Sequence, residues 1–389
     1  MLIATAFLSL TFLVSLATFV IYPRAFIWAS ERRGVYGPEQ GIENKRAHRV
    51  HSISLFISAR NEEAVIRQKI ENCLQLDYPR EKLNIVVLSD GSTDGTKDIA
   101  ISYAGRGIRL LHRDRWCGKN ALLAEALADC RSELVVFSDA NALYDPLAIG
   151  AINASMQDKS VGCVTGRLML DDESTTNALE SAMYWKGETR IKEAEGRLGC
   201  VVAANGAIFA CRRALIPPLA NDTANDFQIP LDVLAKGARS TFASDAIARE
   251  PVTANMKEEF ARKRRIIIRG LTCICRAIAH LPLMIALHLV MRKVARWACP
   301  PLMLTCVIIA CMALCIASEW RLLAILCAVL VTVLALAVAG RIGHGGKPTA
   351  LVNYGVMLTC ATTSALVAFL TGTRVESWVS PTSDRLPKE

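Results

Sequence analysis

Four long stretches of this chain, one at its beginning and three near its end, contain no charged side chain, and this feature constrains the fold more than any other. The stretches are residues 1–23, 297–318, 322–340 and 348–373. A helix of about 20 apolar residues is long enough to cross the hydrocarbon core of a membrane. A buried helical bundle is the alternative for the last three, but the helices of soluble bundles keep a polar face, and these have none.

The first stretch has a second interpretation, as a signal peptide that is cleaved. Its first residues carry no Lys or Arg, and no small-residue cleavage site stands out before Tyr22, which favours a retained anchor. We expect a transmembrane helix over residues 1–28 and about three transmembrane helices over residues 297–373. Residues 277–296, interrupted by His280, Pro282 and His288, are predicted to form an interfacial or re-entrant helix and not a span.

Lys and Arg gather at both ends of the central region and again in the loop at 341–347. Such residues beside spans face the cytoplasm, so we expect a multi-pass protein of the inner (plasma) membrane with a cytoplasmic central region. The net charge of +9 then reflects contact with anionic lipid. Nucleic-acid binding is the competing interpretation, but no nucleic-acid motif accompanies the basic segment. The 14 cysteines show no zinc-type spacing.

The central region, residues 50–275, alternates short apolar runs with segments of helical spacing. The runs 52–58, 84–88, 108–111 and 134–137 are predicted strands, and the segments 64–76 and 119–130 are predicted helices. A further helix is predicted to end near Ala104. Alternation of this kind is typical of an α/β domain with a parallel sheet.

Polar residues follow three of these strands, at 60–63, 90–94 and 139–141. Ligands of parallel sheets bind at the carboxyl ends of the strands, so we expect these clusters to meet at one edge. Asp90 is predicted to point into the crevice, where it could accept hydrogen bonds from a ribose or a base. Asp94 is predicted to cap a helix.

Two further positions carry oxygen-bearing side chains near this edge. Asp139 and Asn141 lie on one side of an extended turn and suit a hard divalent cation carried by a diphosphate. Asp226 is either a helix N-cap without function or a general base beside the crevice. The segment at Lys119 lacks the rest of a Walker motif, which excludes a P-loop nucleoside triphosphatase.

Together, these segments resemble the family 2 glycosyltransferases of GT-A fold in order, spacing and residue type. They are 59–63 (ARNEE), 89–96 (SDGSTDGT), 118–122 (GKNAL) and 138–141 (SDAN), and the similarity continues through 184–185, Glu188, 205–210 and 225–226. The flanking spans resemble the membrane-embedded branch of exopolysaccharide, cellulose and hyaluronan synthases. The resemblance implies an α/β domain of GT-A fold with a mixed, mostly parallel sheet.

The resemblance also implies a UDP- or GDP-linked sugar donor, a divalent metal ion (Mg²⁺ or Mn²⁺) and inversion at the anomeric carbon. Asp226 matches the base on the acceptor hydroxyl, and Asp139 and Asn141 match the site for the metal and the donor diphosphate. The expected donor-binding residues are Ala59, Asn61, Glu62, Asp90, Lys119, Asp139 and Arg265. Trp185 and Asn205 are candidate acceptor contacts, although helical spacing also favours a place for Trp185 in the core.

Two positions depart from the family pattern. Asn141 stands where a second carboxylate is usual, so we expect either weaker metal binding or a larger contribution from Asp139. Processive synthases carry Gln-x-x-Arg-Trp before the C-terminal spans, where residues 262–266 read RKRRI. The arginine is kept as Arg265 and could hold the diphosphate, or the basic residues could only contact lipid. Ile266 cannot stack on an acceptor sugar, which argues against processive synthesis.

We therefore predict an inverting membrane glycosyltransferase, of the hexosyltransferase class, that extends an exopolysaccharide or other cell-surface glycan. The first alternative is a non-processive enzyme that glycosylates a lipid carrier or a glycolipid. An alternative of another class is a catalytically silent subunit that binds a nucleotide sugar. The expected partners are the donor, a glycan or lipid-linked acceptor and membrane lipid, without nucleic acid.

Overall fold

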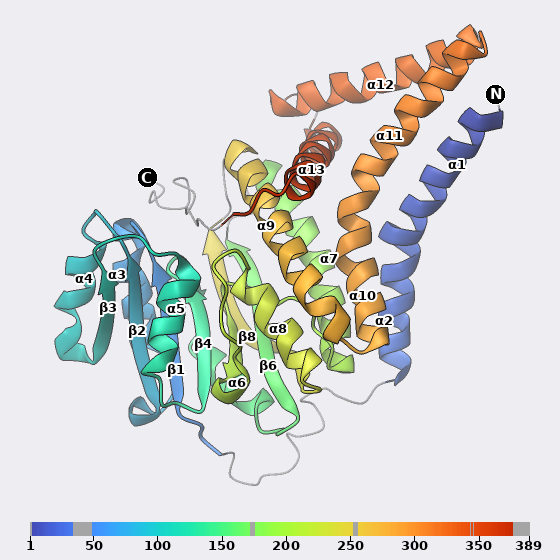
Figure 1. Cartoon of the computed structure of the whole chain (residues 1–389). Helices are drawn as coiled ribbons and strands as arrows, with labels where there is room; N and C mark the ends of the chain where they lie inside the picture. Colours follow the sequence, from blue (N-terminus) through green and yellow to red (C-terminus); the bar gives the residue numbers. More distant parts are fainter. Residues whose placement is uncertain are drawn as a thin grey trace.

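The computed structural model describes residues 2–33, 49–171, 176–251, 256–342, 344 and 346–375. Figure 1 shows two regions, a sheet with helices on both faces and a group of long helices that rise from it. Helices α1 (Leu2–Leu16) and α2 (Tyr22–Arg33) lead into the sheet domain, and the chain returns to the long helices after α9 (Met256–Ala277).

Eight strands form one sheet in the order β3-β2-β1-β4-β7-β6-β8-β5. The pairs β1–β2, β2–β3, β1–β4 and β6–β8 are parallel, and β7 lies antiparallel between β4 and β6. The strands are β1 (Ile53–Ala59), β2 (Leu83–Asp90), β3 (Ile108–Arg113), β4 (Leu134–Asp139), β5 (Leu143–Tyr144), β6 (Val161–Asp171), β7 (Phe209–Arg212) and β8 (Arg239–Pro251). The predicted mixed, mostly parallel sheet is confirmed, and the four predicted strands are β1 to β4.

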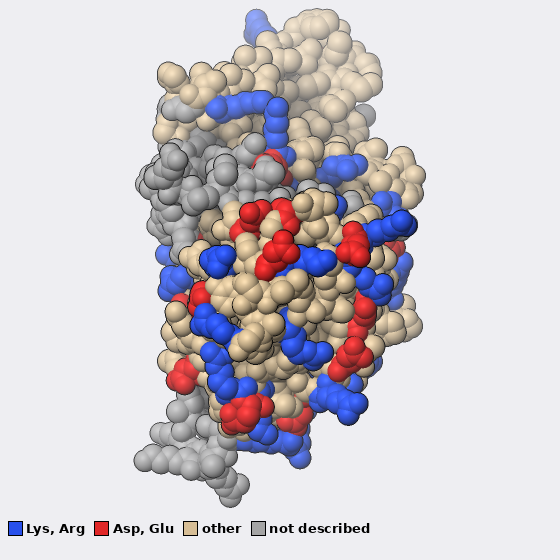
Figure 2. Space-filling model, turned by 90° about the vertical axis from the view of Figure 1, so that its left-hand side faces the viewer, with Lys and Arg blue, Asp and Glu red and all other residues tan. Residues whose placement is uncertain are grey.

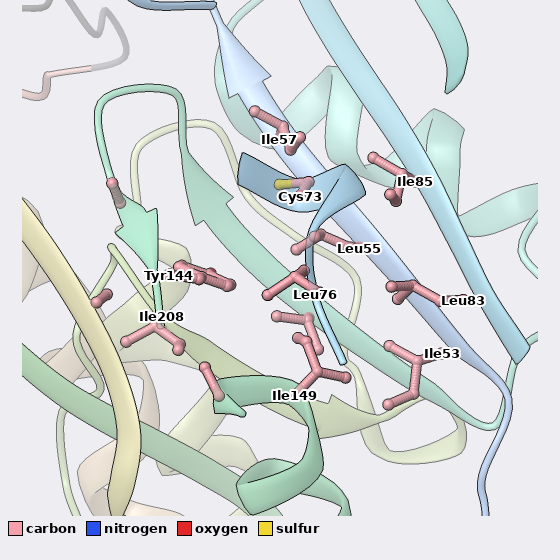
Figure 3. Close-up of a cluster of buried hydrophobic side chains, with 14 of the residues drawn as sticks. Ile53, Leu55, Ile57, Cys73, Leu76, Leu83, Ile85, Tyr144, Ile149 and Ile208 are labelled. Carbon is pink, nitrogen blue, oxygen red and sulfur yellow. The ribbon is translucent and has the colours of Figure 1, made fainter. Parts of the chain in front are cut away.

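The sheet is buried on both faces because its strands alternate side chains between two cores. Leu55 belongs to the core beneath helices α3 (Glu63–Leu74) and α6 (Ala148–Ser155), and the next residue, Phe56, belongs to the core beneath α5 (Lys119–Ala128) and α8 (Asn225–Ala235). Figure 3 shows side chains of the first core converging on the sheet. Each large apolar side chain buried in this way contributes about 1.5–3 kcal/mol.

Four helices are long and apolar enough to cross a membrane, one near the N-terminus and three near the C-terminus, as predicted. They are Ala6–Arg32, Leu283–Ile316, Trp320–Arg341 and Leu351–Leu370. The second combines α10 (Leu283–Leu289), a π-helical segment (Val290–Val294) and α11 (Ala295–Ile316), and the others include α12 (Trp320–Arg341) and α13 (Gly346–Leu370). Figure 2 shows charged side chains spread over the lower part of the molecule and few in the uppermost part.

The predicted interfacial helix, residues 277–296, is not a separate element in the structure. The chain turns after α9, and one continuous helix then runs from Leu283 to Ile316. The polar residues that suggested a separate helix, His288 and Arg292, both contact Glu195 of helix α7 (Thr176–Leu198). These contacts give both polar side chains a partner and allow the apolar helix to continue through this segment.

The long helices pack directly on the sheet domain. Helix α2 lies against α7, α13 lies against α9, and α1 lies along α11 (Figure 1). Helices α7 and α9 therefore lie between the sheet and the apolar helices, so their side chains can reach both regions.

Candidate active site

The carboxyl ends of the central strands meet at one edge of the sheet, as predicted. Ala59 pairs with Ser89 of β2 in the strand register, and Ser58 pairs with Asp139 of β4. The loop after β1 is tied to the loop after β2 by Asn61, whose Oδ1 accepts the N–H of Thr93 at 2.7 Å. The three polar loops therefore form one rim at this edge of the sheet.

Asp94 serves the starts of two helices, which agrees with its predicted capping role. Its Oδ2 accepts the N–H of Glu63, the first residue of α3, at 3.1 Å. Its Oδ1 accepts the N–H of Thr96, the first residue of α4 (Thr96–Ser102), at 3.1 Å. Satisfying these N–H groups stabilises both helices and fixes the loop between them.

Asp90 lies at the end of β2 and is 6% exposed. Its Oδ1 accepts the N–H of Cys117 at 2.8 Å, and its Oδ2 accepts the N–H of Gly118 at 3.0 Å. Gly118 adopts φ 95°, a left-handed conformation that favours glycine. Asp90 therefore holds the loop that presents Lys119, and it borders a small pocket shared with Ala59 and Lys119. Direct contact with a nucleoside stays a prediction.

Lys119 is the first residue of α5, and its Nζ donates to Asp139 Oδ1 at 2.6 Å. Both side chains are mostly buried, with exposures of 13% and 23%. A hydrogen bond between two such charged groups is stronger than a neutral one. The pair places a cation and a carboxylate side by side at the end of β4, where a diphosphate and its metal ion would each find a partner.

Asp226 faces Asp139 across Gly206. A Cβ atom on Gly206 would lie 3.3 Å from Asp226 Oδ2 and 3.5 Å from Asp139 Oδ2. Helix α8 begins at Asn225 with Ala224 as its N-cap, so Asp226 is not the N-cap. Burial raises the pKa of the Asp226 carboxyl, and Asp139 adds to this effect, while Lys119, Lys192 and Arg269 oppose it. A carboxylate with a raised pKa is suited to accept a proton.

One cavity of about 340 Å³ connects these residues with the long helices. On the sheet side it is lined by Glu62, Lys119, Asp139, Asn141, Gly206 and Asp226. On the opposite side it is lined by Phe19 of the N-terminal helix, Trp297 of α11, and Leu358 and Thr362 of α13. Among the residues predicted for the site, Trp185, Asn205 and Arg265 also line it.

Arg265 brings a buried cation from α9 into the cavity. Burial, together with the neighbouring Arg269 and Arg262, lowers its pKa to about 10, while Asp139 acts in the opposite direction. The guanidinium therefore stays charged at neutral pH. Arg269, one turn later, donates through Nη2 to the carbonyl oxygens of Asn221 and Thr223 and so fixes the loop that leads to Asp226.

The two candidate acceptor residues differ in their surroundings. Trp185 packs against the core and also lines the cavity, so the two predicted roles are compatible. Asn205 is 5% exposed; its Nδ2 donates to Gly166 O at 2.5 Å, and its Oδ1 accepts from Lys192 Nζ. These bonds give Asn205 a structural role, and its contact with an acceptor stays a prediction.

The donor set fits a divalent cation that arrives with a diphosphate. Within the described residues, no group of three or more His, Cys, Asp or Glu side chains could hold a metal ion alone. Magnesium is commonly bound by one or two carboxylates together with substrate phosphates. Asp139 and Asn141 supply such oxygens on the cavity wall, and Gly206 leaves the space beside Asp139 Oδ2 clear.

The predicted site did not include several charged residues that line this cavity. Glu188 and Lys192 lie on α7, and Arg292, Lys293 and Arg296 lie on the helix that contains α11. Two signals were available in the sequence. Residues 188, 192 and 195 follow the spacing that places side chains on one helix face, and basic residues at the end of an apolar helix are functional candidates by default.

Comparisons with known proteins agree with this architecture. The glycosyl transferase family 2 model matches residues 54–216. The probable glycosyltransferase YdaM of Bacillus subtilis is 25% identical over 219 residues, which are 52% of this chain and 51% of that protein. A beta-monoglucosyldiacylglycerol synthase of Nostoc is 28% identical over 141 residues, which are 35% of this chain and 29% of that protein. This chain therefore spans about half or less of the curated relatives that it matches.

A solved structure extends the likeness beyond the sheet. The mannosyltransferase PcManGT from Pyrobaculum calidifontis, in complex with GDP-Man and Mn²⁺, superposes with a TM-score of 0.72 at 22% identity and covers 94% of this chain and 99% of that chain. Coverage of that extent includes the long helices as well as the sheet domain. Residues 54–216 therefore match the glycosyl transferase family 2 model, and they lie within a mixed sheet of GT-A fold flanked by helices able to cross a membrane.

Proposed function

We propose that this protein is an inverting glycosyltransferase that transfers one sugar from a nucleotide-sugar donor to a lipid-linked acceptor at a membrane surface. One observation carries the proposal: a single cavity joins Lys119, Asp139 and Asp226 to residues of the apolar helices. Donor and acceptor would enter this cavity from opposite sides, the donor from water and the acceptor from lipid.

The donor is proposed to bind at the rim of the sheet. Asp90 and the loop that it holds lie beside the small pocket at Ala59, a suitable place for the nucleoside. Lys119 and Arg265 supply positive charge for the diphosphate, which becomes the leaving group. Asp139 and Asn141 would hold a divalent cation, which supplies further charge stabilisation when bound.

The acceptor hydroxyl is proposed to react beside Asp226. The carboxylate accepts the hydroxyl proton while the oxygen attacks the anomeric carbon, and the bond to the diphosphate breaks as the new glycosidic bond forms. A single displacement of this kind inverts the configuration at the anomeric carbon. Lys119 and Arg265 stabilise the charge that develops on the departing diphosphate.

The choice of acceptor follows from the far end of the cavity. Phe19, Trp297 and Leu358 line it there, and these apolar side chains suit a lipid chain. Among the relatives are the diacylglycerol glycolipid synthase and a dodecaprenyl-phosphate galacturonate synthase of Rhizobium johnstonii, which is 24% identical over 139 residues. The extended glycan expected from the sequence stays a prediction, and we prefer the lipid because Ile266 lacks the aromatic ring that stacks on a growing polymer.

The orientation follows from the same arrangement. We propose that the sheet domain lies on the cytoplasmic side of the inner membrane, because nucleotide sugars are soluble anions and basic residues flank the spans on that side. Helix α9, with its four consecutive basic residues at 262–265, would then lie near the anionic headgroups.

A donor panel tests the proposal. Full-length protein in lipid nanodiscs is incubated with radiolabelled UDP- and GDP-sugars, Mn²⁺ or Mg²⁺ and a membrane lipid extract, and the released nucleotide and the organic-phase label are measured. We expect one donor to give both signals, with a single sugar in the product. Absence of release above the Asp226→Asn level with every donor would refute the enzyme, and a ladder of products would favour polysaccharide synthesis.

A further inference from the structure

A cluster of buried charged side chains joins helix α7 to the helix Leu283–Ile316. We call it the charge cluster, and its members are Glu188, Lys192, Glu195, His288, Arg292, Lys293 and Arg296. Five of these seven residues, Glu188, Lys192, Arg292, Lys293 and Arg296, line the cavity that also contains Asp226.

The contacts within the cluster are centred on two carboxylates. Arg292 donates to Glu188 Oε1 at 2.5 Å and to Glu195 Oε1 at 3.0 Å. Lys293 reaches the same oxygen of Glu188 at 3.3 Å, and Arg296 reaches Glu188 Oε2 at 3.5 Å. Glu188 therefore accepts hydrogen bonds from three cationic side chains, and those from Lys293 and Arg296 are longer and weaker than the one from Arg292.

The cluster holds more positive than negative charge. Among its described members, Lys192, Arg292, Lys293 and Arg296 are basic, and Glu188 and Glu195 are acidic. The excess is expensive because the groups are shielded from water: the side-chain exposures are 5% for Glu188, 15% for Lys293 and 25% for Arg296. Unbalanced charge in such surroundings is stabilised when a counter-ion binds.

The protonation equilibria of α7 reflect the same excess. Burial alone would raise the pKa of Glu188, but Arg292, Lys293, Arg296 and Lys192 outweigh it and hold the pKa well below its usual range. Burial lowers the pKa of Lys192 to about 8, although Glu188 opposes this shift. A negatively charged ligand would raise both pKa values, because it stabilises the charged form of Lys192 and offsets the cations around Glu188.

The position of the cluster identifies the kind of anion. Lys192 is close enough to Asp226 to lower the pKa of that carboxyl, and Trp297 follows Arg296 directly in the chain and lines the apolar end of the cavity. Lys192 also donates to Asn205, the neighbour of Gly206, which lies beside Asp226. The cluster therefore adjoins both the proposed base and the apolar side chains that line the same cavity. A ligand that fills the cavity would carry an anionic group between its reacting hydroxyl and its lipid chain.

We infer that the charge cluster is a phosphate subsite, which binds the phosphate that links the acceptor's reacting group to its lipid. This inference rests on the proposed function and narrows it, because it selects phosphate-linked lipids over neutral glycolipids such as diacylglycerol derivatives. The subsite is separate from the donor diphosphate site, whose cations are Lys119 and Arg265. Lys293 and Arg296 are the direct contacts, and Arg292 orients Glu188, the carboxylate that holds them.

The test uses farnesyl phosphate as a short probe and farnesol as its neutral counterpart. Binding of each to full-length protein in uncharged detergent is measured at equilibrium, with phosphatidylglycerol as a competitor that represents bulk lipid. The variant is Arg296→Gln, which leaves Glu188 paired with Arg292 and Lys293. The matched control is Arg276→Gln, because Arg276 pairs with Asp222 at 2.8 Å and is 52% exposed. Thermal unfolding of each variant checks that it is folded.

We expect farnesyl phosphate to bind at least about tenfold more tightly than farnesol. Arg296→Gln should weaken the binding of farnesyl phosphate but not of farnesol, by roughly tenfold or more, because a charge-assisted hydrogen bond is lost. Arg276→Gln should bind farnesyl phosphate as the wild type does. Equal binding of the two probes, or equal effects of the two arginine variants, would overturn the subsite. Equal displacement by phosphatidylglycerol would overturn its assignment to the acceptor.

The outcome is distinguishable from failure of the proposed function. Selective binding of farnesyl phosphate by a protein that transfers no sugar would refute the enzyme and support the subsite. Transfer to lipids without a phosphate, at the same rate as to lipids that carry one, would support the enzyme and overturn the subsite.

Discussion

Gly206 separates the two carboxylates on which the proposed chemistry depends, and Gly206→Ala tests that geometry directly. The added Cβ would lie 3.3 Å from Asp226 Oδ2 and 3.5 Å from Asp139 Oδ2. The first contact is tighter than an ordinary carbon–oxygen contact, so Asp226 must move by a few tenths of an ångström. Alanine is compatible with the backbone here, because Gly206 is not among the residues with positive φ.

The expected effect is on catalysis and not on stability. The methyl group fills the space in which the anomeric carbon, the diphosphate and the acceptor hydroxyl must meet. Because misplacement of reacting groups by about 1 Å can cost roughly 100-fold in rate, we expect kcat/KM to fall by about 10- to 100-fold, which is about 1.4–2.7 kcal/mol of transition-state stabilisation. The free energy of unfolding should change by less than about 1 kcal/mol.

The assay measures nucleotide release in the presence of acceptor, together with thermal unfolding. Gly150→Ala is the matched control, because a Cβ on Gly150 of α6 meets no atom within 4 Å. The control should keep full activity and gain up to about 1 kcal/mol of stability, since alanine favours a helix. If Gly206→Ala keeps kcat/KM within threefold of the wild type, Asp139 and Asp226 do not converge on the reacting atoms.

Three further predictions concern pH, metal and stability. Burial raises the pKa of Asp226, so the base is protonated at pH values that leave an ordinary aspartate ionised. In a pH–rate profile, kcat/KM should therefore fall on acidification with a midpoint above 3.8. Asn141→Asp adds a carboxylate ligand and should lower the Mn²⁺ concentration needed for half-maximal activity, measured by metal titration. Glu195→Gln leaves the buried Arg292 with one carboxylate and should lower the free energy of unfolding by about 3–5 kcal/mol, measured by denaturant unfolding. The control Glu133→Gln breaks a surface pair with Arg49 and should lower it by less than about 1 kcal/mol.

The sequence predicted the first half of the sheet domain well because that half is built from local, repeating units. Strands β1 to β4 are apolar runs that end in polar loops, and each is followed or preceded by a helix with clear periodicity. The apolar helices were equally clear, because an uncharged stretch of about 20 residues has few alternatives.

The second half was not predicted because its pairing is not local. Strand β7 is only four residues long, Phe209–Arg212, yet it lies antiparallel between β4 and β6. That insertion brings Gly206 beside Asp139, although 67 positions separate them in the chain. The charge cluster was missed for the same reason: Glu188 and Arg292 are 104 positions apart, and each alone resembles a surface residue.

The role of Asp226 as the base is tested most directly by comparing donor binding and sugar transfer in Asp226→Asn. The amide keeps the shape of the side chain but cannot accept the acceptor's proton. With the donor identified by the panel, we predict that the donor Kd stays within about threefold of the wild type while the transfer rate falls by roughly 10²- to 10⁴-fold. Transfer above a tenth of the wild-type rate, or a parallel loss of donor binding, would contradict the assignment of Asp226 as the base.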